Sequence, residues 1–162
     1  MKKQILLLGI FGMFLLASCS QQDATNDSTP QLTWAANPIL DGVSVTTIDT
    51  LTVGDTLLLP MTFSGVYNPL TSIQITNDTA YSAISFPYAS SLGSSVLNNG
   101  QTNVSKGYFY FVGLNIYMVN LAVEYIPKQA TTGTKLSFVV SSTSQYSPLS
   151  GSFTFIAKAK KK

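Results

Sequence analysis

Apolar and polar residues alternate with a period of two in four separate stretches of this sequence. The clearest stretch is 117–125, in which every second residue belongs to one apolar face: Tyr117, Val119, Leu121, Val123 and Tyr125. The other three are 56–63, 135–140 and 152–158. A period of two is the spacing of a β-strand with one face on a core and the other in solvent. These stretches therefore predict a protein built from sheets.

Shorter segments add to the number of expected strands. Residues 43–45 and 73–75 each place apolar residues on both sides of a polar one, and 108–112 is wholly apolar, as expected for a strand buried on both faces. Pro60 interrupts the second stretch and predicts an edge or a bulge there, because proline cannot donate a ladder hydrogen bond. The total is about seven to nine strands.

Turn-forming residues separate these segments at 53–55, 65–69, 98–100, 132–133 and 147–151. Asn99-Gly100 is a typical hairpin sequence. Short strands with such turns and no long helix predict an all-β fold, an antiparallel β-sandwich. Residues 81–106 are the least regular part, so we expect an insertion or a binding loop there.

The segment 51–57, Leu-Thr-Val-Gly-Asp-Thr-Leu, resembles the entry into the second strand of many bacterial immunoglobulin-like domains. The resemblance covers seven residues and implies an immunoglobulin-like sandwich. A jelly roll and a small barrel are the alternatives.

The first residues have the pattern of a secretory signal peptide. Lys2 and Lys3 precede an apolar run at 5–17, which ends in small residues before Cys19. As a helix, about thirteen residues rise about 20 Å, which is short of a bilayer core of about 30 Å. We therefore interpret 1–18 as a targeting segment that does not span the membrane.

Leu16-Ala17-Ser18-Cys19 resembles the lipobox of bacterial lipoproteins, and Cys19 is the only cysteine. The resemblance implies diacylation of the Cys19 thiol, cleavage before it, and a membrane partner reached through the lipid. Ser20 then favours the outer membrane, and a Bacteroidota-type envelope lipoprotein with either periplasmic or cell-surface exposure is expected. The alternative is an ordinary signal peptide followed by an incidental cysteine.

The rest of the chain divides into three parts. Residues 19–30 are polar and are expected to form a flexible tether behind the lipidated cysteine. Residues 31–158 suffice for a single β-sandwich domain, and 159–162 form a basic tail.

Composition excludes several chemistries. The chain has no His and one Cys, so a Ser-His-Asp triad and a thiolate or imidazole metal site are excluded, and we predict no metal and no cofactor. Without Lys2 and Lys3, seven of the nine Lys and Arg residues remain against seven acids, which argues against nucleic acid as a partner.

A carboxylate pair remains formally possible for a small hydrolase, although aspartates in turns ordinarily accept hydrogen bonds from nearby backbone amides. Its candidates are Asp41, Asp49, Asp55, Asp78 and Glu124.

Four of the six aspartates precede Ser or Thr in a context that resembles the O-glycosylation signal of Bacteroidota proteins. The alternative is that Asp-Thr serves turns alone. The resemblance implies modification of the hydroxyls of Ser28, Thr50, Thr56 and Thr79.

Aromatic residues in or beside the expected loops are the candidate ligand contacts, because flat amphipathic rings stack on sugars or anchor protein partners. They are Trp34, Tyr67, Tyr81, Tyr88 and Tyr146. The alternative is that they cap the ends of the sandwich.

The sequence thus favours a non-enzymatic, lipid-anchored envelope protein, a binding or structural module for a glycan or an envelope protein. A carbohydrate-binding accessory and the carboxylate hydrolase are the alternatives, and the ligand and oligomeric state stay open.

Overall fold

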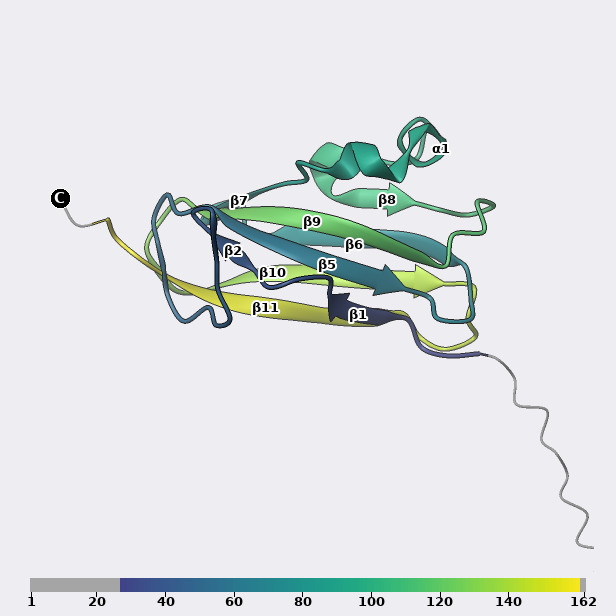
Figure 1. Cartoon of the computed structure of the whole chain (residues 1–162), viewed down its shortest axis with the longest axis horizontal. Helices are drawn as coiled ribbons and strands as arrows, with labels where there is room; N and C mark the ends of the chain where they lie inside the picture. The colour runs from purple at the N-terminus through teal and green to yellow at the C-terminus, as the bar shows by residue number, and fades with distance from the viewer. Residues whose placement is uncertain (1–26, 161–162) are drawn as a thin grey trace, which may run out of the picture.

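The computed structural model describes residues 27–160, which form two packed β-sheets (Figure 1). The predicted signal peptide, Cys19 with its lipobox and the first part of the predicted tether lie outside the described residues, as do Lys161 and Lys162.

The first sheet runs in the order β3-β2-β5-β9-β7, with β1 also paired to β5. Its strands are β1 (Gln31–Trp34), β2 (Ile39–Leu40), β3 (Val43–Ser44), β5 (Leu57–Ser64), β7 (Ser82–Ser85) and β9 (Met118–Pro127). The second sheet runs β4-β11-β10-β6-β8. Its strands are β4 (Leu51–Thr52), β6 (Leu70–Asn77), β8 (Tyr108–Tyr110), β10 (Thr131–Ser142) and β11 (Leu149–Lys158). Short helical turns lie between β7 and β8: η1 (Ala89–Leu92), α1 (Ser94–Leu97) and η2 (Val104–Lys106).

The predicted all-β sandwich is confirmed. The orders β2-β5-β9-β7 and β11-β10-β6 correspond to the A-B-E-D and G-F-C sheets of an immunoglobulin sandwich. β4 and β8 extend the second sheet, and β4 pairs in parallel with β11, while the other pairs within 27–160 are antiparallel. Eight of the strands have three or more residues, which agrees with the expected number, and β2, β3 and β4 are two-residue pairs.

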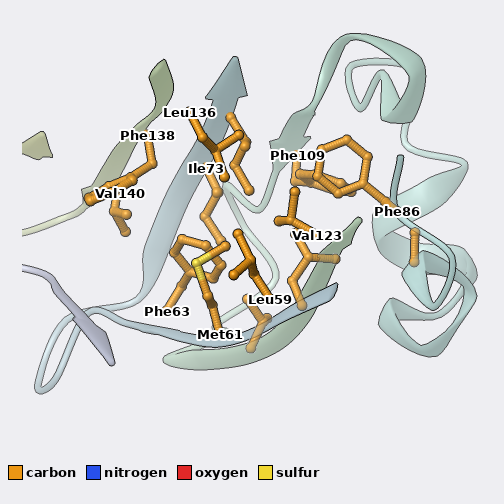
Figure 2. Packing of buried hydrophobic residues seen from close by; sticks show 14 of the residues in the cluster. Leu59, Met61, Phe63, Ile73, Phe86, Phe109, Val123, Leu136, Phe138 and Val140 are labelled. Carbon is orange, nitrogen blue, oxygen red and sulfur yellow. The ribbon is translucent and has the colours of Figure 1, made fainter. Parts of the chain in front are cut away.

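The alternating stretches supply the core between the two sheets (Figure 2). In β5 the side chains of Leu57, Leu59, Met61 and Phe63 are buried while their neighbours are partly exposed. They face buried residues of the second sheet, including Ile73, Leu136 and Val140. The period of two thus identified the buried face of each long strand.

Pro60 lies inside β5, which is neither an edge strand nor bulged against β9 as predicted, because the interruption lies in the chain on its other side. β1 pairs with residues 61–64 of β5 and β2 pairs with 57–58, so the chain between β1 and β2 breaks away opposite Pro60. On the side of β5 that faces β1 and β2, Pro60 makes a hydrogen bond only through its carbonyl, which accepts from the Ala35 amide. Because proline has no amide hydrogen, the break leaves no donor without a partner.

Three expectations about local structure are wrong. The segment 108–112 is not buried on both faces, because only one face of it packs on the core. Phe109 and Phe111 are buried, whereas the alternate residues are partly or fully exposed, with Val112 in solvent. Tyr117 does not share the buried face of β9, since it precedes the strand and is exposed. Asn99-Gly100 follows α1 and makes no hairpin, because the Asn99 side chain closes a local turn by accepting from the Gln101 and Thr102 amides.

The described chain begins within the segment predicted as tether. The Asp27 carboxylate accepts hydrogen bonds from the Asn68 side chain at 2.6 Å and from the Gln145 amide at 3.1 Å, and Pro30 is buried. Residues 27–30 are therefore held against the turns that follow β5 and β10.

Candidate binding site

A hollow of about 300 Å³ lies along the open edge of the sandwich, between β1 of the first sheet and the β10–β11 hairpin of the second. We call it the Trp34 hollow. Its lining residues are Leu32, Thr33, Trp34, Met61, Phe138, Leu149, Ser150 and Phe153.

Trp34 forms one wall of the hollow and is held by both sheets. As the last residue of β1, it pairs with Met61 of β5, and its ring stacks on Phe153 of β11 at a centroid distance of 5.2 Å and an interplanar angle of 26°. Phe153 in turn packs against Phe138 at 5.5 Å. The three rings form one continuous aromatic surface, yet Trp34 is still 47% exposed.

Gly151 determines where the Phe138 ring of this surface can lie. It pairs with Phe138 across the β10–β11 hairpin, and a Cβ added to it would lie 2.7 Å from the Phe138 Cζ atom. The absence of a side chain at Gly151 thus allows the Phe138 ring to lie against the neighbouring strand.

The lining of the Trp34 hollow is apolar except for the hydroxyls of Thr33 and Ser150 and the main chain. None of the eight lining side chains is charged, so the hollow offers flat stacking surfaces and two hydroxyls but no acid or base. Such a lining suits a ligand with an apolar face and peripheral hydrogen-bonding groups.

The structure does not bring the five predicted stacking residues together. Tyr67 and Tyr146 lie in the β5–β6 and β10–β11 turns at one end of the sandwich, and Tyr81 lies in the β6–β7 turn at the other end. Tyr88 precedes η1 and is exposed. Of the five, only Trp34 lines the hollow.

The four predicted glycosylation residues differ in accessibility. Thr79 is exposed in the turn before β7, and Thr50 and Thr56 are partly exposed. The Ser28 hydroxyl oxygen is buried and has no hydrogen-bond partner among the described residues. A glycan on Ser28 would therefore require segment 27–30 to leave its position.

Four of the five candidate catalytic acids act as local hydrogen-bond acceptors. Asp41 accepts from the Thr56 amide, Asp55 from the Thr52 amide and Asp78 from the Ala80 amide. Glu124 accepts from the Ser85 hydroxyl across the β7–β9 pair at 2.9 Å. Within the described range, no group of three His, Cys, Asp or Glu residues is arranged to hold a metal ion.

Sequence reasoning missed most of the hollow. Phe138 and Phe153 were assigned to core faces by their alternation, and Leu32 and Leu149 stand in segments without a strong pattern. No sequence pattern near Trp34 indicates that β1 ends there or that no strand continues beyond it to cover the aromatic rings of the hollow. Whether these rings are covered depends on how β1 and β11, which are distant in the sequence, come together in the fold.

No known protein family model matches this chain, and no curated protein matches it. Within residues 27–160, no helix has the length and apolarity needed to span a bilayer.

Proposed function

We propose that this protein is a lipid-anchored envelope protein whose β-sandwich is a non-enzymatic binding module, with the Trp34 hollow as its ligand site. The lipobox residues 16–19 support the anchor. The uncharged lining of the hollow supports binding without acid-base chemistry.

The observation that carries this proposal is the exposed stack of Trp34 on Phe153. A tryptophan is mostly buried on average, and leaving half of this ring in solvent forgoes part of the free energy that burial would supply. A ligand that covers the ring recovers that free energy. The stack is also preformed, so little conformational entropy is lost on binding.

The same stack favours a carbohydrate as the ligand. The C–H face of a pyranose ring is apolar and flat, while its hydroxyls lie at the rim, which matches an aromatic wall flanked by Thr33 and Ser150. A carbohydrate-binding accessory lipoprotein is therefore the specific form of the proposal. No arrangement of the acids favours the carboxylate hydrolase.

The anchor is tested by intact-mass analysis of the mature protein together with protease treatment of intact cells. We expect a mass that begins at Cys19 and includes acyl chains. A mature chain that carries no lipid would refute the anchor. Removal of the domain by external protease would place it on the cell surface, and protection would place it in the periplasm.

The ligand site is tested by following Trp34 fluorescence while soluble envelope polysaccharides and their oligosaccharides are added. Trp34 is the only tryptophan, so its emission reports this site alone. We expect a saturable change that is lost in Phe153→Ala, together with loss of binding by Trp34→Ala in calorimetry. Tyr88→Ala is the matched control, because Tyr88 is exposed but lies outside the hollow. Equal loss of binding in the control, or no binding to any glycan, would refute a carbohydrate site.

A further inference from the structure

Charged residues are distributed unevenly along the long axis of the domain. The end formed by segment 27–30 and the turns 65–69, 111–117 and 143–148, which we call the tether end, contains one charged residue, Asp27. The opposite end, which we call the distal end, contains seven of the eleven charged residues within 27–160: Asp41, Asp49, Asp55, Asp78, Lys128, Lys158 and Lys160. The tether end is on the right in Figure 1, where β5 and β10 terminate.

The tether end exposes aromatic and apolar side chains where the distal end has charged ones. Tyr67, Tyr117, Met118 and Tyr146 are each about half exposed or more. Hydrogen bonds join the turns that present them: the Gly65 amide donates to the Tyr117 carbonyl, and the Thr143 amide donates to the Pro69 carbonyl. The exposed rings therefore belong to one continuous surface of three connected turns.

The incoming chain is attached to this same surface. Asp27 accepts hydrogen bonds from Asn68 of one turn and from Gln145 of another. Seven residues separate Asp27 from Cys19, so the Cα atoms of the two residues can be at most about 28 Å apart even when the chain between them is fully extended.

This reach is shorter than the domain is long. β10 alone has twelve residues and spans about 40 Å from one end of the sandwich toward the other. With a lipid on Cys19, an orientation with the distal end pointing at the bilayer would require Asp27 to stand farther from the membrane than its tether allows. The tether end is the end that faces the membrane in any upright orientation.

We propose that the tether end is a membrane-contact surface, in which Tyr67, Tyr117, Met118 and Tyr146 sit among the lipid headgroups and direct the distal end away from the bilayer. The proposal rests on the lipid anchor proposed above. Tyrosine suits this position because its ring is apolar and its hydroxyl is polar, as in the aromatic belts of membrane proteins. The absence of lysine at this end means that the contact depends on interfacial aromatic burial and requires no anionic lipid.

The test uses the mature lipidated protein in vesicles of phosphatidylethanolamine and phosphatidylglycerol, with a polarity-sensitive fluorophore on one introduced cysteine. Ser147→Cys places the label in the β10–β11 turn at the tether end, and Ala130→Cys places it in the β9–β10 turn at the distal end. Both positions are exposed, and the acylated Cys19 thiol does not react with the label. We expect a blue shift of the emission at position 147 and none at position 130.

A second pair of variants tests the aromatic residues themselves. In the background of Ser147→Cys, the double variant Tyr67→Ser with Tyr146→Ser is expected to lose the blue shift. Tyr88→Ser is expected to keep it, and it is a matched control because Tyr88 and Tyr67 are 59% and 61% exposed. The shift should also persist in about 1 M salt, where electrostatic screening acts over about 3 Å.

The outcomes separate this proposal from the anchor. An unacylated mass and no co-sedimentation with vesicles would refute the anchor and remove the basis of the membrane contact with it. Acylated protein that co-sediments but gives no shift at either position would overturn the membrane-contact surface alone. Equal shifts at positions 147 and 130 would also overturn it, since they indicate a domain lying on its side.

Discussion

Phe138 and Gly151 illustrate how single residues shape the candidate site. Phe138 lies directly opposite Gly151 in the β10–β11 pair, and its ring occupies the space that a side chain at 151 would take. The same ring packs against Phe153, which carries the Trp34 stack. A change at a glycine with no functional group is therefore transmitted through two rings to the ligand site.

We predict that Gly151→Ala lowers the free energy of unfolding by about 1–3 kcal/mol, because the new methyl group forces the Phe138 ring out of a packed position. Urea denaturation measures this loss, and a changed Trp34 emission maximum should accompany it. Gly133→Ala in the paired strand β10 is the control, since its added Cβ would meet Thr154 only at an ordinary 3.4 Å. Equal losses of unfolding free energy in the two variants would show that the loss comes from the change in strand propensity and not from displacement of the Phe138 ring.

The charge of Asp27 governs how segment 27–30 is attached. Hydrogen bonds from the Ser144 side chain, the Gln145 amide and the Asn68 side chain hold the pKa of Asp27 below its ordinary value of 3.8, against the opposing effect of desolvation. A lowered pKa in the folded state means that the attachment is fully stabilised above the ordinary pKa and weakens as the pH falls through the lowered one.

We predict that the amide chemical shift of Gln145 changes as the pH falls from about 6 to about 2, with a midpoint below that of an unfolded aspartate. The measurement is an NMR pH titration. Asp27→Asn is the control, and its Gln145 amide should show no such transition. A midpoint at or above the ordinary value in the native chain would contradict the hydrogen-bonded arrangement.

At the scale of elements, the segment 86–107 is an irregular region in which side-chain hydrogen bonds supplement a single β-bridge, between Asn103 and Tyr108. Val96 of α1 is buried in the core, and the Asn99 side-chain Nδ2 donates to the Tyr110 carbonyl of β8 at 2.8 Å. Asn99 also accepts from two amides of its own turn. The Asn99 side chain thus helps to fix the path of the chain from α1 back to the edge strand β8, together with the Thr102 hydroxyl, which accepts from the Tyr110 amide.

We predict that Asn99→Ala lowers the free energy of unfolding by about 1–3 kcal/mol, because it leaves partly buried backbone groups without partners. Chemical denaturation measures the loss, and the amides of 101 and 102 should exchange faster with solvent. Asn98→Ala is the control, since Asn98 is the exposed neighbour in the same turn. Unchanged exchange at 101 and 102 would contradict this role of Asn99.

At the scale of the whole molecule, a single core joins both sheets. The buried cluster includes residues from β5 and β9 of the first sheet and from β6, β10 and β11 of the second, so neither sheet can bury its apolar face without the other. Trp34 fluorescence is expected to report on the packing of the two sheets, because Trp34 belongs to β1 of the first sheet and its ring stacks on Phe153 of the second.

We therefore predict one cooperative unfolding transition, in which far-UV circular dichroism and Trp34 fluorescence change at the same temperature. Thermal denaturation followed by both probes measures this. A fluorescence transition well below the dichroism transition would show that β1 detaches before the sandwich unfolds, and the Trp34 hollow would then be a labile edge.

The sequence by itself determined which faces are buried and what chemistry is available. The period of two in 56–63 and 135–140 identified buried faces because pleating alone sends alternate side chains to opposite sides. The lack of histidine excluded imidazole chemistry wherever the chain might fold.

Tertiary structure decided everything that depends on which strands become neighbours. The stack of Trp34 on Phe153 joins residues more than a hundred positions apart, and the contact of Asp27 with Gln145 does the same. Likewise, 108–112 has a sequence suited to burial on both faces, but in the fold only the face with Phe109 and Phe111 meets the core, and Val112 lies in solvent. Local sequence specifies the pattern of each strand, whereas a site formed where two sheets meet depends on the pairing of the whole chain.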